Sequence, residues 1–123
     1  MARRLARLPA IRPVVTLKLH VGTDHLIGPR GALLLRGIRD SGSISIAARE
    51  AGMSYRSGWS YVSEMSRLVG SALVRSTRGG AKGGGATKLT PTGVEILREY
   101  DRFDRRVSRI LGSDRKPRKA EKV

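Results

Sequence analysis

The stretch from Ser41 to Met65 reads S-G-S-I-S-I-A-A-R-E-A-G-M-S-Y-R-S-G-W-S-Y-V-S-E-M, and Leu73 to Thr92 reads L-V-R-S-T-R-G-G-A-K-G-G-G-A-T-K-L-T-P-T. The first stretch predicts two helices. Ser45 caps an Ala-rich helix by accepting a backbone N–H bond, Gly52 ends it, and Ser54 caps the next helix. The second stretch predicts a strand at 73–77, a Gly-rich tip and a returning strand at 87–89. The predicted order is therefore two helices, a tight turn between them, and a β-hairpin.

Small side chains fall where the two helices should cross. Alanines in the first helix allow a close approach, and Gly58 in the second leaves space for it. The second helix also has an apolar row at spacings of three and four, which should face the core. These residues are Ala47, Ala48 and Ala51 in the first helix, and Val62, Met65 and Val69 in the second. The pattern is that of a helix-turn-helix, and the hairpin after it would be a wing.

The rest of the chain fits one small domain. Apolar and polar residues alternate from Val15 to Val21, which predicts a half-buried strand, followed by a loop at 22–28. Pro29 suits the first position of a helix that runs to Asp40. We expect a flexible basic arm at residues 1–13, a DNA-binding domain at 14–111 and a basic disordered tail at 112–123. The fold class is mainly α with a small β wing.

The last helix, with Thr92 as its predicted cap, carries an apolar seam. Its members are spaced four, three, four and three residues apart, which is an a/d pattern. The seam residues are Ile96, Tyr100, Phe103, Val107 and Ile110, widened by Leu97 and Leu111. One interpretation is that the seam is simply core. The seam is long for so small a domain, however, so we expect a partner helix to cover part of it in a homodimer. Asp101 and Arg105 are expected to pair across one turn.

The charge of the chain indicates a polyanionic partner. The 123 residues carry a formal net charge of +15 and a pI of about 11.6. An isolated domain gains little from such self-repulsion, so nucleic acid is the favoured partner and an anionic membrane surface is the alternative. No apolar run approaches the length of a transmembrane helix. We expect a cytoplasmic, nucleoid-associated protein.

The outer face of the second helix is the predicted contact with DNA bases. Arg56 could bind guanine O6 and N7 as a fork, while serines and tyrosines reach phosphates, sugars or base edges. The predicted DNA contacts on this helix and its cap are Ser54, Tyr55, Arg56, Ser57, Ser60 and Tyr61. Those elsewhere are Ser45, Arg49, Arg78, Lys82 and Lys88, with Arg75 also beside the glycines of the tip. The alternatives are a helical hairpin with a solvated polar face and a merely flexible loop.

Other chemistries have little support in the sequence. There is no Cys, and two histidines, His20 and His25, without a close pair of carboxylates make a poor metal site. The Gly-rich tip lacks the Gly-Lys-Ser/Thr that a Walker loop requires. No nucleophile–base–orienter set is present, so we expect no catalysis, no metal and no cofactor. Trp59 is expected to pack rather than to stack on a base.

Taken together, these residues resemble the N-terminal DNA-binding domain of ModE, the molybdate-responsive bacterial transcription regulator. The resemblance covers roughly Val14 to Leu111. The chain is also similar, more distantly, to the winged helix of LysR-type regulators. The matching strings are T-L-K-L at 16–19, S-G-S-I-S at 41–45, A-G-M-S-Y-R-S-G-W at 51–59, E-M at 64–65, G-G-A-K-G-G-G-A, L-T and Y-D at 100–101. The resemblance implies a winged-helix homodimer on a palindromic operator. It also implies that the helix after Ser54 is the recognition helix and that the last helix helps to join subunits.

One departure from the family bears on ligand sensing. ModE continues into molybdate-binding domains, whereas this sequence ends in S-D-R-K-P-R-K-A-E-K-V, so molybdate binding by this chain is not expected. The main hypothesis is a sequence-specific transcriptional regulator that binds double-stranded DNA as a homodimer and no membrane. The alternative is an architectural, sequence-nonspecific DNA-binding protein, which the charge and the tails favour.

Overall fold

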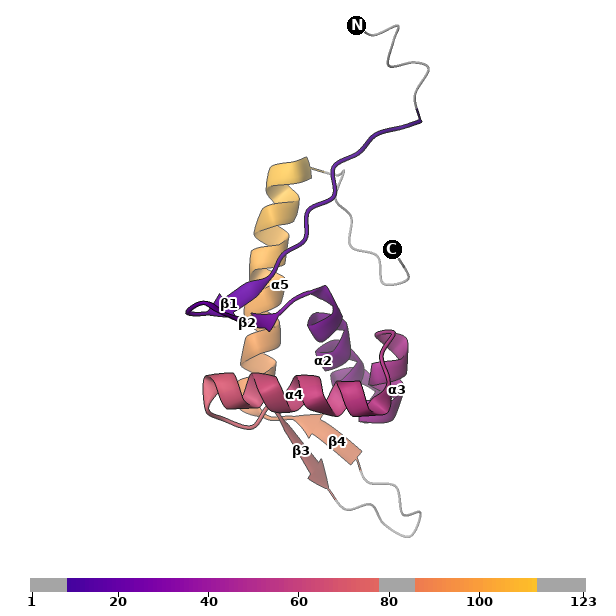
Figure 1. The fold of residues 1–123 in the computed structure, drawn as a ribbon, viewed down its shortest axis with the longest axis vertical. Coiled ribbons are helices and arrows are strands. Elements are labelled where there is room, and N and C mark those ends of the chain that lie inside the picture. The colour runs from indigo at the N-terminus through magenta and orange to yellow at the C-terminus, as the bar shows by residue number, and fades with distance from the viewer. Residues whose placement is uncertain (1–8, 78–85, 113–123) are drawn as a thin grey trace, which may run out of the picture.

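A computed structural model describes residues 9–77 and 86–112. Within these residues the chain forms four helices and two separate two-stranded antiparallel sheets. The elements are β1 (Leu19–Val21), β2 (Asp24–Ile27), α2 (Pro29–Ser41), α3 (Ile44–Glu50), α4 (Tyr55–Val69), β3 (Val74–Thr77), β4 (Ala86–Leu89) and α5 (Pro91–Leu111). Helices α2, α3 and α4 lie together, α5 rises beyond them, and the β3–β4 hairpin projects from the opposite end (Figure 1).

Helix α2 lies at the centre of the core. Its Leu34, Leu35 and Ile38 are fully buried, and α3, β2 and α5 all pack against it. The core is built largely from aliphatic side chains, with Tyr100 as its one buried aromatic among the described residues. At about 25 cal/mol per Å² of buried apolar surface, this aliphatic contact is the main stabilising term of the domain.

Close helix crossings confirm the role predicted for the small residues. A Cβ built on Gly37 of α2 would lie 2.7 Å from the Cβ of Ala47, so only glycine lets α2 and α3 approach this closely. A Cβ on Gly58 of α4 would lie 3.0 Å from the Cβ of Ala48. Gly58 is buried, as are Val62 and Met65 on the same side of α4. The sequence of small residues therefore sets how tightly α4 is held against α3.

The turn between α3 and α4 is as tight as predicted, although the residue predicted to cap the start of α3 is wrong. Gly52 has φ +76°, the left-handed conformation that glycine adopts most readily, and the N–H of Met53 donates to the carbonyl of Ala48. The cap of α3 is Ser43 and not Ser45, because Ser43 Oγ accepts the N–H of Ile46 at 3.1 Å. Ser45 instead lies exposed within the first turn of α3.

The N-terminal region differs from its prediction. The strand expected over residues 15–21 is limited to β1, and the loop expected at 22–28 contains strand β2, which pairs with β1. The two strands are joined by Gly22 and Thr23, and Gly22 takes φ +61°. A two-residue turn that begins with a left-handed glycine is a common hairpin connection. Gly22 and Thr23 therefore indicate a hairpin within the segment that was predicted to be a loop.

The second hairpin has its strands within one residue of the prediction. The β3–β4 register pairs Arg75 with Lys88, and the predicted tip at 78–85 lies outside the described residues. The predicted cap of α5 is wrong: Thr90, not Thr92, accepts the N–H of Gly93 through Oγ1 at 3.2 Å. Pro91 then occupies the first helical position, where the lack of an N–H costs nothing. Among the described residues, no helix has the length and apolarity needed to cross a membrane.

Candidate nucleic-acid interface

The exposed side of α4 carries a straight row of polar and basic side chains. Ser54 fixes where the helix begins, since its Oγ accepts the N–H of Ser57 at 3.0 Å. The apolar row described above points inward, so the opposite face is left to solvent. Four exposed residues on that face follow the helical spacing of four, three and four. We call Arg56, Ser60, Ser63 and Arg67 the α4 stripe.

Only two of the four members of the α4 stripe were predicted from the sequence as DNA contacts. Arg56 and Ser60 were predicted, whereas Ser63 and Arg67 were not, although the same spacing continues to them. Arg67 forms an exposed ion pair with Glu64, one turn away, at 2.5 Å. The hydrogen bond from Arg67 lowers the pKa of the Glu64 carboxyl and raises that of the guanidinium. Both groups are in solvent, so a phosphate could replace the carboxylate at little cost.

The remaining predicted residues of α4 divide into two groups. Ser54, Tyr55 and Ser57 are exposed in the first turn, and the ring of Tyr55 packs edge-on against Trp59 with centroids 6.5 Å apart. Trp59 itself packs against the core, as predicted. Tyr61 lies apart from the stripe because its side chain faces β2. Its hydroxyl accepts the N–H of Gly28 at 3.4 Å.

Arg30 of α2 is a further residue that the sequence interpretation missed. Its guanidinium donates to the carbonyl of Gly52 at 2.8 Å and, less closely, to that of Ala51. These carbonyls lie at the end of α3, where a cation also interacts favourably with the helix dipole. Arg30 therefore ties α2 to the turn that orients α4. Its partners are backbone atoms more than twenty residues away, so nothing in the local sequence pattern indicated this role.

Exposed side chains that were predicted to contact DNA also occur on α3 and on the β3–β4 hairpin. Ser45 and Arg49 of α3 are both exposed. Arg75 and Lys88 face each other across the β3–β4 hairpin and are also exposed. The predicted contacts Arg78 and Lys82 lie outside the described residues. The structure thus brings exposed cations to α3, α4 and the base of the second hairpin.

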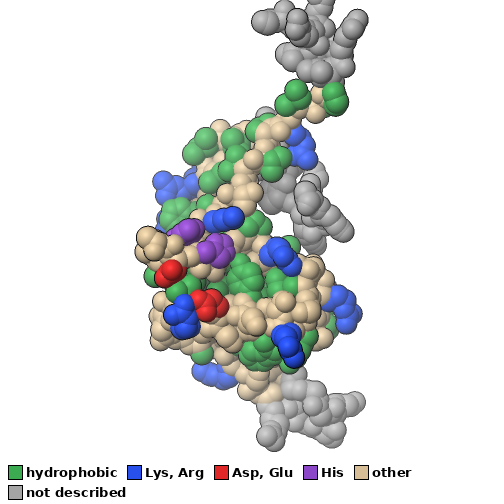
Figure 2. Space-filling model, in the orientation of Figure 1, with side chains coloured by type: hydrophobic (Ala, Val, Ile, Leu, Met, Phe, Trp, Pro, Cys, Tyr) green, Lys and Arg blue, Asp and Glu red, His purple; other side chains and the backbone are tan. Residues whose placement is uncertain are grey.

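A pair of histidines lies beside α4 on the first hairpin. Figure 2 shows both side chains on one face of the molecule, with Lys or Arg and acidic side chains around them. His20 and His25 face each other across β1 and β2 with ring centroids 5.7 Å apart, and His25 Nε2 is 3.4 Å from the Tyr61 hydroxyl. Partial burial, followed by the charges of His20 and Lys18, lowers the pKa of His25. No group of three metal-ligating side chains occurs in the part of the chain that the structure describes.

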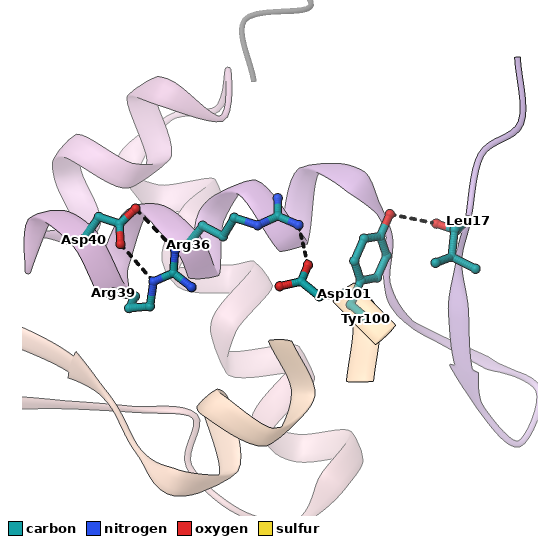
Figure 3. Close-up of polar contacts among 6 residues, drawn as sticks. All are labelled: Leu17, Arg36, Arg39, Asp40, Tyr100 and Asp101. Carbon is teal, nitrogen blue, oxygen red and sulfur yellow. Dashed lines mark hydrogen bonds and ion pairs between the residues drawn. The ribbon is translucent and has the colours of Figure 1, made fainter. Parts of the chain in front are cut away.

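Helix α5 is attached to the body by two adjacent residues. Asp101 pairs with Arg36 of α2 at 2.5 Å, so its predicted pairing with Arg105 is wrong. Tyr100 is buried and donates its hydroxyl to the carbonyl of Leu17 at 3.3 Å. Figure 3 shows these two contacts leaving α5 in different directions, toward α2 and toward the segment before β1. The two contacts therefore tie α5 to α2 and to the segment before β1.

The five residues predicted for a dimer interface do not share one environment. Ile96 and Tyr100 belong to the core of their own subunit. Phe103 and Val107 are half-buried, and Ile110 is 82% exposed. Ile11 and Val14, in the extended segment before β1, are also strongly exposed. Only the outer part of the predicted seam is therefore available to another molecule.

The fold and this surface define a small mixed α/β domain that presents a basic and polar helix beside a β-hairpin. Searched against known families, the chain matches no family model. Over 88 residues it is 45% identical to the "DNA-binding transcriptional dual regulator ModE" of Escherichia coli K12, covering 72% of this chain and 32% of that protein. It is 39% identical over 91 residues to the "Molybdenum-pterin-binding protein MopB" of Rhodobacter capsulatus, covering 74% and 33%.

A third relative is covered to a similar extent. The chain is 42% identical over 82 residues to the "Molybdenum transport protein ModE" of Herbaspirillum seropedicae, covering 67% of this chain and 30% of that protein. The chain therefore spans about a third of the length of the curated relatives that it matches.

Proposed function

We propose that this chain is a ModE-type winged helix-turn-helix domain that binds double-stranded DNA sequence-specifically and regulates transcription in the cytoplasm. The observation that carries the proposal is the α4 stripe, exposed on a helix that Gly52, Gly58 and Arg30 hold against α3. A helix of this kind enters the major groove, with side chains on its exposed face near the base edges. The similarity to a relative named as a DNA-binding transcriptional regulator supports the same function.

In this proposal each element has a distinct role. Helix α4 reads bases, while Arg49 of α3 and the pair Arg75 and Lys88 on the β3–β4 wing bind phosphates on either side. Arg78 and Lys82 of the wing remain predicted contacts. Phosphate contacts set the register of the protein on DNA, and base contacts supply specificity. The region responsible is the predicted domain 14–111.

We further propose that the domain acts as a homodimer on a palindromic operator. The outer part of the α5 seam supports this, because Phe103, Val107 and Ile110 leave apolar surface uncovered. A second copy packed there would place two α4 helices in successive major grooves, roughly 34 Å apart. The names of the relatives mention molybdenum, but this chain spans only about a third of them, so molybdate sensing is not assigned to it.

The Arg56→Ala substitution tests the role of α4 directly. We expect the variant to lose about 1–3 kcal/mol of discrimination at one base pair, because a forked contact to guanine is removed. The measurement is fluorescence anisotropy with the preferred duplex and with single-base variants of it. Lys88→Ala serves as the control and should weaken all duplexes about equally. If Arg56→Ala also weakens all duplexes equally, Arg56 binds phosphate and the base-reading role is wrong.

A sequence-nonspecific architectural protein remains the second candidate function. The net charge of +15 favours it, since electrostatic contacts alone supply nonspecific binding. Competition with random duplex separates the two functions. A regulator keeps its preferred site under a large excess of random DNA, whereas an architectural protein exchanges freely.

A further inference from the structure

Helix α5 carries a second row of arginines that the proposed DNA contact does not use. Four of them are spaced four, three and four residues apart and are all exposed. We call Arg98, Arg102, Arg105 and Arg109 the α5 stripe. The spacing places them on one face, over about 16 Å of helix axis. Arg106, also exposed, lies at the edge of the same face.

The α5 stripe lies opposite the side of α5 that packs on the protein. Ile96, Leu97 and Tyr100 are buried on the inner side, and Asp101 there binds Arg36. The outer seam residues Phe103 and Val107 follow the inner side toward the C-terminus of the helix. A second copy that covers Val107 and the inner side of the seam would therefore leave Arg98, Arg105 and Arg109 in solvent.

Few acids neutralise this stripe. Within residues 9–77 and 86–112, Arg98, Arg105 and Arg109 form no ion pair. Arg102 is the exception, since it donates to Glu99 at 2.7 Å while its guanidinium lies 4.7 Å from the centre of the Phe103 ring. Four like charges on one helix face repel each other, and an anionic partner would remove that cost.

We propose that the α5 stripe binds the phosphates of a second duplex DNA segment, separate from the one held by α4. A DNA strand presents about one phosphate per 3.4 Å of duplex axis, so several phosphates fall within the roughly 16 Å that the α5 stripe covers. Arginine also forms forked contacts with phosphate oxygens. Figure 1 shows α4 in front of the base of α5, whose outer half rises away from α4 and from the β3–β4 hairpin. The α5 stripe therefore extends along a helix whose outer half lies away from α4.

The inference rests on the proposed function only in that both partners are DNA. Its consequence is that one subunit joins two stretches of duplex, so the protein bridges DNA as well as reading it. Because the stripe contacts only phosphates, the second segment is held without regard to sequence.

A bridging assay with the full chain tests the inference. A biotin-labelled duplex is fixed to beads, the protein is added, and capture of a fluorescent duplex from solution is measured. We expect the triple variant Arg98→Gln, Arg105→Gln, Arg109→Gln to reduce capture by roughly tenfold or more, and to lower the salt dependence of capture by about three in log–log slope. Protein retained on the fixed duplex should stay within about twofold, because the α4 contacts are intact.

The matched control replaces the same three arginines by lysine, which keeps the charge and the helix propensity. Retained bridging in the lysine variant, with loss in the glutamine variant, supports the inference. Equal capture by the glutamine variant and the wild type overturns it, since bridging would then run through two α4 faces of a dimer. Loss of binding to phosphatidylglycerol vesicles without loss of bridging would also overturn it. Wild-type protein that fails to bind the fixed duplex would overturn the proposed function as well.

Discussion

Raising the salt concentration from about 50 to about 200 mM is expected to weaken binding to duplex DNA by roughly 10³-fold, the low end for proteins that make 6–10 phosphate contacts. The reason is that each Lys or Arg that binds a phosphate releases a condensed counterion, and this release is less favourable when the bulk salt is high. A net charge of +15, with exposed cations on α3, α4 and the β3–β4 hairpin, would provide the contacts in the proposed function. Fluorescence anisotropy titrations at several salt concentrations give the slope.

The variant Arg75→Gln, Lys88→Gln is the control for this prediction. These two cations lie across from each other on the β3–β4 hairpin, so their loss should reduce the log–log salt slope by about two. The fold should not change, because both side chains are exposed. A wild-type loss of less than about tenfold over this range would contradict a phosphate-dominated interface.

Gly93→Ala is expected to lower the free energy of unfolding by about 2 kcal/mol, the typical cost of overpacking. A Cβ at this position would lie 2.4 Å from the carbonyl oxygen of Leu73 and 3.3 Å from Leu89 Cδ2. The oxygen belongs to the backbone and already accepts the N–H of Thr90 at 2.9 Å, so it cannot move without breaking this bond at the base of the β3–β4 hairpin. The cost should exceed the gain of about 1 kcal/mol in helix propensity that alanine offers.

Urea unfolding followed by circular dichroism measures this change. Thr92→Ala in the same turn is the control, because Thr92 makes one exposed side-chain contact, to Ser71, and should change stability by no more than about 0.5–1 kcal/mol. A Gly93→Ala protein as stable as the wild type would mean that α5 does not pack this closely against Leu73.

Local patterns in the sequence were enough to predict the helices that carry the site. The Ala-rich segment, Gly52 and Ser54 specify short-range events, namely a close crossing, a left-handed turn and a cap, and all three are confirmed. The inward row of α4 followed the helical period, so its exposed face was also predictable. Ser63 and Arg67 were missed although the same period reaches them.

The errors fall where several residues of one type compete or where the partner is distant in sequence. Ser43 and Ser45 can both cap a helix, as can Thr90 and Thr92, and only the packed structure selects between them. Asp101 has Arg105 within one turn, yet it binds Arg36 of another helix. The role of Arg30 likewise depends on a fold-level contact. Propensity and spacing do not contain such information.

The measurement that tests the central proposal most directly is selection of bound sequences from randomised duplex DNA at near-physiological salt, followed by sequencing. A regulator that reads bases through α4 of two subunits should enrich a palindrome whose half-sites lie about one helical turn apart. The same selection with Arg56→Ala should lose preference at one position in each half-site. Tight, salt-sensitive binding with no enriched sequence would contradict sequence-specific recognition and would favour the architectural function.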